Sequence, residues 1–228
     1  MSLVRAKRYN LTFYKMSGSE SDDDLPQLSV ETFGALQEFY KEQEERESKI
    51  NYVINNGDVT FEEDWQLSQF WYDDNTIDIL VKIVVQAVGK TGKVALISCP
   101  TLYKKLRHEA EPGCEITLYE FDKRFSAFGE DYVFYDYKSP LGVPRDKSDY
   151  YDIVIADPPF LSEECITKTA VTIRYLTKNK IILCTGVIME DLAKRLLDLR
   201  KSTFEPKHRN NLANEFGCFT NFEIEKPS

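Results

Sequence analysis

The tetrapeptide Asp157-Pro158-Pro159-Phe160 has the residue types and the order needed to hold an amino group. It follows residues 151–156, an apolar run that is typical of a strand buried on both faces. Two consecutive prolines have no N–H to donate, so strand pairing must stop there. At the carboxyl end of such a strand, the Asp157 carboxylate, two unpaired carbonyls and the Phe160 ring would converge on a ligand. We therefore predict an acceptor-rich site for an amine; the alternative is an ordinary strand end.

Further carboxylates stand where two other predicted strands end. Glu120 and Asp122 close the run 115–121, and Asp136 follows the run 132–135. In nucleotide-binding α/β folds, an acid about 20 residues past the first turn binds ribose hydroxyls, so we favour Asp122 and keep Glu120 as second choice. Asp136 is placed to accept a hydrogen bond from an adenine amino group. Each acid alone could be solvated surface, but acids ending three consecutive strands predict a nucleotide-like cofactor site.

The turn after the first predicted strand, Ser98-Cys99-Pro100-Thr101, contains no glycine. Such folds usually have glycine there, because the backbone must come close to the cofactor. Small residues and proline can also make a tight turn, so Ser98 and Pro100 are predicted cofactor contacts. Trp71 is a further candidate, because the aromatic stretch 65–72 precedes the first strong helix. That stretch is either a lid over a cofactor pocket or a packed edge of the core.

Alternating strand and helix patterns must position these residues. Apolar runs predict strands at residues 93–98, 115–121, 132–135, 152–157 and 180–184. Helical spacing predicts helices from Asp74 or Asn75 to Gly89, around Ile166, Ala170, Ile173 and Leu176, and around Leu192, Leu196 and Leu199. Residues 202–206 and 216–224 would form a terminal hairpin. The pattern predicts an α/β fold with a Rossmann-like, mostly parallel seven-strand sheet and a terminal antiparallel hairpin.

The length of 228 residues suits one domain with a sizeable core. Residues 1–15 are basic, lack acids and read as an extension upstream of Met16, and residues 17–24 are polar and acidic. We therefore assign residues 1–26 to a disordered or extraneous N-terminal segment. Residues 27–228 form the predicted domain, which begins with a helix after Ser29 and includes the aromatic stretch 65–72.

Composition limits the classes of partner. The formal net charge is -9, and the chain after residue 15 is more acidic still, which disfavours a stable complex with nucleic acid. The five cysteines lack C-x-x-C spacing and there are two histidines, so we expect reduced thiols and no metal site. No apolar stretch reaches about 18 residues. We expect a cytoplasmic monomer that does not enter membranes.

Residues Asp157 to Phe160 resemble motif IV of S-adenosylmethionine-dependent amino-methyltransferases, which include adenine-N6, glutamine and some lysine enzymes. Six segments together look like the eukaryotic elongation factor 1-alpha lysine methyltransferase 1 family, formerly described as an adenine-N6 DNA methyltransferase. They are residues 65–71, 119–125, 134–137, 153–165, 183–186 and 211–216. The resemblance implies a methyltransferase fold, S-adenosylmethionine as cofactor, and methyl transfer to a lysine of elongation factor 1-alpha.

The chemistry of lysine methylation suggests a role for each motif residue. Lysine has a pKa near 10.4 and must lose a proton before its nitrogen can attack a methyl group. A carboxylate alone favours the charged amine, so Asp157 is better suited to orient the amine than to act as a strong base. The carbonyls of Asp157 and Pro158 would hold N–H groups, with Phe160 against the lysine stem. An adenine-N6 methyltransferase acting on DNA or RNA, and a noncatalytic binding subunit, remain the alternatives.

Overall fold

The computed structural model describes Thr32 and residues 34–41, 61–210 and 214–224. The chain divides into two compact units, Met1–Glu47 and Ser48–Ser228. In the first unit, Thr32 and residues 34–41 are helical, and Leu36, Phe39 and Tyr40 are exposed. The predicted segment 1–26 and the predicted helix start after Ser29 lie outside the described residues. None of the helices in the described ranges is long and apolar enough to span a membrane.

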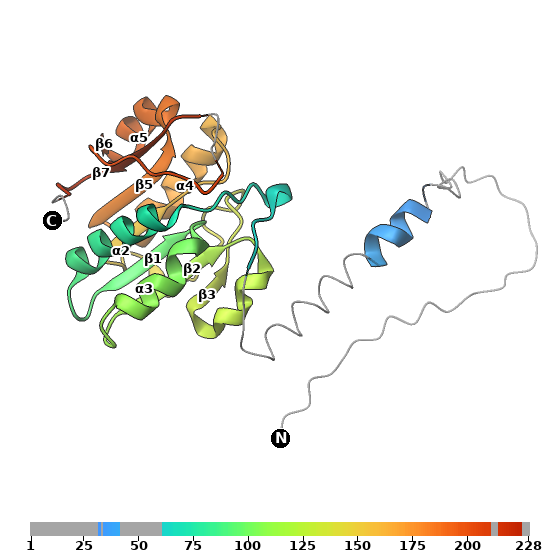
Figure 1. Cartoon of the computed structure of the whole chain (residues 1–228), viewed down its shortest axis with the longest axis horizontal. Coiled ribbons are helices and arrows are strands. Elements are labelled where there is room, and N and C mark those ends of the chain that lie inside the picture. The colour runs from blue at the N-terminus through green and yellow to red at the C-terminus, as the bar shows by residue number, and fades with distance from the viewer. Residues whose placement is uncertain (1–31, 33, 42–60, 211–213, 225–228) are drawn as a thin grey trace, which may run out of the picture. The chain divides into compact units, whose positions relative to one another are not determined.

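The second unit is built on one seven-stranded sheet with the order β3-β2-β1-β4-β5-β7-β6 (Figure 1). The strands are β1 (Lys93–Ile97), β2 (Glu115–Glu120), β3 (Tyr132–Phe134), β4 (Ile153–Ala156), β5 (Lys180–Gly186), β6 (Arg200–Lys201) and β7 (Phe216–Thr220). Strands β1 to β5 pair in parallel, and β7 is antiparallel to both β5 and β6. The predicted fold class, a mostly parallel sheet ending in an antiparallel hairpin, is confirmed.

The bounds of the hairpin strands differ from the prediction. The first strand is β6, which ends at Lys201, so the predicted strand at 202–206 is wrong. The Ser202 hydroxyl accepts a hydrogen bond from the Phe204 N–H at 3.2 Å, which turns the chain out of the sheet. Pro206 has no N–H to contribute to a ladder. The second strand ends at Thr220, whose hydroxyl donates to the Phe222 carbonyl at 2.7 Å, before the predicted end at residue 224.

Helices cover both faces of the sheet. Helices α2 (Asp74–Val88) and α3 (Tyr103–Glu109) pack on one face, as Figure 1 shows, and α4 (Glu163–Leu176) and α5 (Glu190–Leu197) pack on the other. Short 3-10 helices connect them: η1 (Trp65–Leu67), η2 (Pro100–Leu102), η3 (Lys123–Asp131), η4 (Arg145–Lys147) and η5 (Val187–Met189). In β1, Val94 and Leu96 face the first layer while Ala95 and Ile97 face the second. Burial on both faces explains the unbroken apolar runs of the central strands.

Helix α2 is capped one residue earlier than predicted. The cap is Asp73, rather than Asp74 or Asn75, since its backbone is extended and its carboxylate accepts a hydrogen bond from Thr76 N–H at 2.7 Å. A capping residue must stand just outside the helix to reach these unpaired N–H groups. Gly89 ends the helix with a φ of 66°, as its position predicted.

The cap at Asp73 should contribute measurable stability. Asp73→Ala leaves a helix N–H unpaired and is expected to lower the free energy of unfolding by about 1 kcal/mol. Urea unfolding would measure the loss, with Asn75→Ala as the control because Asn75 is exposed within the first turn. Equal stability of the two variants would show that the cap contributes little.

Candidate active site

A cavity of about 430 Å³ lies at the carboxyl edge of the parallel strands. Its volume falls within the range of about 300–1,000 Å³ that is usual for small-molecule sites. All of the predicted site residues except Asp122 line it: Trp71, Ser98, Pro100, Glu120, Asp136, Asp157, Pro158, Pro159 and Phe160. These residues come from the ends of four strands and from the aromatic stretch before α2, so the cavity exists only in the folded sheet.

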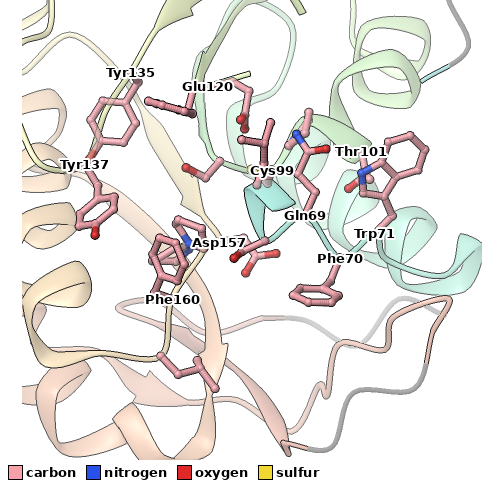
Figure 2. Close-up of a pocket in the computed structure, with 18 of the residues that line it drawn as sticks. Gln69, Phe70, Trp71, Cys99, Thr101, Glu120, Tyr135, Tyr137, Asp157 and Phe160 are labelled. Carbon is pink, nitrogen blue, oxygen red and sulfur yellow. The ribbon is translucent and has the colours of Figure 1, made fainter. Parts of the chain in front are cut away.

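The Asp-Pro-Pro-Phe segment leaves the sheet at Asp157. The Asp157 N–H donates to the Ile97 carbonyl at 3.0 Å, and the prolines that follow have no N–H to continue the ladder. Within the described part of the chain, no hydrogen bond is donated to the carbonyls of Asp157 or Pro158. Figure 2 shows Phe160 and Phe70 on opposite sides of the Asp157 carboxyl. The segment thus presents acceptors between two aromatic rings, which suits an amine on an apolar stem.

Tyr72 lies next to the Asp157 carboxyl but does not line the cavity. The sequence did not indicate this contact. The Tyr72 side chain is 1% exposed, and its hydroxyl lies beside the carboxyl without a hydrogen bond of normal geometry. The Tyr72 ring packs on His208 with 5.0 Å between centroids, and the two residues also form an antiparallel bridge. The aromatic stretch 65–72 was the available signal, but its spacing did not show which ring would face the acid.

Backbone pairing holds the aromatic stretch along the cavity. The Arg209 N–H donates to the Trp71 carbonyl at 2.8 Å, and the Asp73 N–H donates to the Lys207 carbonyl at 2.9 Å. The Glu63 carboxylate also accepts a hydrogen bond from the Trp71 N–H at 2.8 Å. A chain segment more than 130 residues away in sequence therefore fixes one wall of the cavity. Trp71 also borders a second cavity of about 180 Å³.

Burial raises the pKa of two carboxyls in the cavity. It raises the pKa of Asp157 to about 7, with a smaller contribution from the charge of Glu120, while the Tyr72 hydroxyl acts in the opposite direction. Burial likewise raises the pKa of Glu120 to about 7. Desolvation disfavours the charged form of each acid, and a nearby cation reverses that preference. The cavity is therefore suited to a positively charged ligand.

Asp122 does not line the cavity, whereas Glu120, the second choice from the sequence, does. The Asp122 carboxylate accepts hydrogen bonds from Gln69 Nε2 at 2.9 Å and Arg124 Nε at 2.7 Å, and it caps η3 through the Arg124 N–H. The Asp122 N–H donates to Glu120 Oε1 at 3.0 Å. Glu120, which lines the cavity, is thus the acid available to a ligand, and Asp122 holds it in place.

The turn after β1 contains a residue in the left-handed backbone region although it contains no glycine. Ser98 has a φ of 54°, in the left-handed region that side chains disfavour, and its N–H donates to the Tyr119 carbonyl at 2.9 Å. Pro100 then starts η2. Left-handed non-glycine residues cost about 1–3 kcal/mol and concentrate at functional sites. The predicted turn is therefore tight, with Ser98 and Pro100 both facing the cavity.

The far end of the cavity is formed by aromatic residues around the third acid. Phe121, Tyr135 and Tyr137 line it together with Asp136, whose Oδ1 accepts a hydrogen bond from the Lys138 N–H at 2.9 Å. In Figure 2, Tyr135 and Tyr137 lie to the left of Glu120. Among the described residues, no group of three His, Cys, Asp or Glu side chains is arranged to hold a metal ion.

Comparisons with known proteins agree with this geometry. The family described as "Probable N6-adenine methyltransferase" matches residues 63–224. EEF1A lysine methyltransferase 1 of Gallus gallus is 50% identical over 206 residues, which cover 89% of this chain and 97% of the relative. The Homo sapiens protein of the same name is 48% identical over 89% of this chain and 94% of its own length. The chain belongs to the EEF1A lysine methyltransferase 1 family.

A solved structure supports the fold of this family. A branched-chain polyamine synthase mutein from Thermus thermophilus, in complex with N4-aminopropylspermidine and 5'-methylthioadenosine, matches with a TM-score of 0.56. The match covers 79% of this chain and 66% of that chain at 9% identity, so it bears on the fold alone. Within the family, the names of relatives refer to protein lysine and the family description refers to adenine.

Because the pKa of Asp157 is raised, we predict that this residue lowers the free energy of unfolding as pH rises. The folded state binds this proton more tightly than the unfolded chain, so the Asp157 contribution to stability falls as pH rises from about 4 to 7. Asp157→Asn should therefore be more stable than wild type above pH 7, by at most about 4 kcal/mol, with the gain disappearing near pH 4. Urea unfolding at pH 5 and pH 8, with exposed Asp191→Asn as control, would measure it. A less stable Asn variant at pH 8 would contradict the assignment.

Proposed function

We propose that the protein transfers a methyl group from S-adenosylmethionine to a lysine of translation elongation factor 1-alpha (EEF1A). The observation that carries this proposal is the Asp157 site, where partly buried acceptors face a cavity between aromatic rings. A chain about half identical to enzymes named for EEF1A lysine methylation has the motif that such chemistry needs. The acidic character of the chain suits a basic protein substrate.

The residues of the cavity fit the proposed cofactor. Glu120 would hold the ribose hydroxyls, and Asp136 would accept the adenine amino group beside Phe121. Ser98 and Pro100 bring the backbone close, and Trp71 lines the adjoining wall. When bound, S-adenosylmethionine supplies a methyl group on a positively charged sulfur. Carboxyls whose pKa is raised by burial suit such a cation, and no phosphate needs a glycine-rich cradle.

Asp157 and its neighbours would position the lysine amine. The unpaired carbonyls of Asp157 and Pro158 accept its N–H groups, and the fixed backbone leaves its lone pair pointed into the cavity. The rigid Pro159 directs the chain so that Phe160 lies against the lysine stem. Phe160 also packs edge-on to Tyr137, with 5.8 Å between ring centroids, so its ring is held in place.

Burial also favours the amine form that reacts. A buried amine loses its proton more readily than one in water, because the charged form is desolvated. The Tyr72 hydroxyl supports the ionised Asp157 carboxyl, which then orients the amine without needing to be a strong base. Tyr72 thus acts through Asp157 and does not line the cavity itself.

Adenine-N6 methylation is the second candidate, because the family description names it. The same rings could stack on a flipped base, so the motif does not separate the two substrates. Nucleic acid requires a surface that neutralises phosphates, whereas this chain has a net charge of -9. Electrostatics therefore favour the lysine. We further propose that the enzyme works as a monomer in the cytoplasm, where the elongation factor acts.

Methyl transfer can be tested directly with radiolabelled S-adenosylmethionine. Wild-type protein should label purified EEF1A, and mass spectrometry should find the label on lysine; duplex and single-stranded DNA should stay unlabelled. Asp157→Ala should reduce transfer by at least 100-fold while cofactor affinity stays within a few fold, and Phe160→Ala should also impair transfer. Label in DNA adenine with none in EEF1A would reverse the choice of substrate, and full turnover by Asp157→Ala would refute the mechanism.

The assignment of Glu120 to the cofactor can be tested by calorimetry. Glu120→Gln keeps the acceptor for the Asp122 N–H but removes a charge-assisted acceptor for ribose, so affinity for S-adenosylhomocysteine should fall about 10-fold or more. The control is Glu111→Gln, an exposed position before β2. Unchanged affinity in Glu120→Gln would show that Asp122 or another residue, and not Glu120, binds the ribose hydroxyls.

A further inference from the structure

An exposed apolar surface adjoins the mouth of the cavity. It consists of Phe160, Leu161 and Ile188, and is called the Ile188 patch below. Ile188 is 81% exposed and Phe160 is 44% exposed. Phe160 and Leu161 also line the cavity. A Cβ built on Gly186 would lie 3.0 Å from Leu161 Cδ1 and 3.6 Å from Ile188 Cγ2, so the two side chains meet above this glycine. The patch is therefore continuous with the site.

The backbone holds Ile188 outward between two anchored neighbours. The Val187 N–H donates to the Glu215 carbonyl at 2.8 Å, one residue before Phe216, which lines the cavity. Met189 is 9% exposed and packs inward. Single exposed apolar residues are common on protein surfaces and need no explanation. An exposed isoleucine beside an active site is different, because a large substrate that enters next to Phe160 would contact it.

Charged residues of both signs surround the patch, with Lys138 among the residues that line the cavity. Glu163 and Glu164 begin α4, and Glu190 and Asp191 begin α5. Arg195 pairs with Glu163 at 3.3 Å, and Lys168 pairs with Glu164 at 2.8 Å.

Glu190 and Asp191 are the unpaired acids next to Ile188. Both are exposed, and neither forms an ion pair with another residue in the part of the chain that the structure describes. Lys194 lies a turn further along α5 and is also exposed. Two unpaired carboxylates two and three residues after an exposed isoleucine attract cations to an apolar surface.

We propose that the Ile188 patch, with Glu190 and Asp191, is the docking site for the basic protein segment that carries the target lysine. An apolar side chain of that segment packs on Ile188, and its cationic side chains face the two acids. This inference rests on the proposed function. A lysine that enters the cavity leaves its own backbone at the rim, so the flanking residues of the substrate must lie on this surface. Nucleic acid would be repelled by the same carboxylates.

Steady-state methyl transfer to folded EEF1A tests the site. Ile188→Asp and the double variant Glu190→Lys/Asp191→Lys should each raise KM for EEF1A at least 10-fold, with kcat within about threefold of wild type. Affinity for S-adenosylhomocysteine should not change, because none of the three residues lines the cavity. The wild-type KM should rise with salt, and the double variant should lose part of that dependence.

Matched controls separate docking from general effects of charge. Val171→Asp places the same acid at another exposed apolar position, 41% exposed on α4, and Glu111→Lys reverses an exposed charge before β2. Both should keep KM within about twofold of wild type, and thermal unfolding should show all variants folded. If wild type labels EEF1A and the Ile188 and acid variants keep its KM, the docking site is refuted while the function stands. If wild type does not label EEF1A, the function and the docking site fall together.

Discussion

The end of the β1–β4 ladder is the constraint on which the site depends. The Asp157 N–H makes a final hydrogen bond to Ile97, and the two prolines that follow make another impossible. The chain must turn away at the point where the carboxyl ends of the parallel strands meet, which is where this class of sheet binds ligands. Because strand pairing stops there, the carbonyls of Asp157 and Pro158 are left as free hydrogen-bond acceptors among the residues that the structure describes. Their positions are fixed by the sheet from which the chain departs.

Electrostatics determine what such a site can hold. Glu120 and Asp157 are acids in a desolvated cavity, and burial disfavours the charged form of each by raising its pKa to about 7. A cationic cofactor and a lysine are the ligands that relieve this cost, whereas phosphate-rich ligands would increase it. Desolvation makes the carboxylates unfavourable without a ligand. The same desolvation makes them suited to binding a cation.

Recognition of the substrate is separate from the chemistry. The Asp-Pro-Pro-Phe segment can orient an amine on a flat or slender group, and the family description names adenine whereas the names of relatives give lysine. Selectivity must then come from surfaces outside the cavity. The surface that adjoins the cavity is apolar at Ile188 and has exposed acids at Glu190 and Asp191, and those properties suit a basic protein better than a nucleic acid.

Local pattern in the sequence predicted the five parallel strands and most of the residues that line the cavity. Apolar runs showed the parallel strands because the central ones are buried on both faces, and the double proline showed where one of them must stop. Acids at the ends of strands were brought to one edge by parallel topology alone. These features depend on periodicity and on the covalent limits of proline, both of which are local.

Tertiary structure decided what depends on the direction of a side chain or on distant contacts. Alternation along β2 did not distinguish Glu120 from Asp122, because the Asp122 carboxylate is held by the neighbouring Arg124 and by Gln69 from a distant segment. The left-handed backbone of Ser98 is stabilised by surrounding strands and has no signature in a turn without glycine. Tyr72 reaches Asp157 only because residues 207–209 pair with the aromatic stretch, a contact between distant parts of the chain that no local pattern encodes.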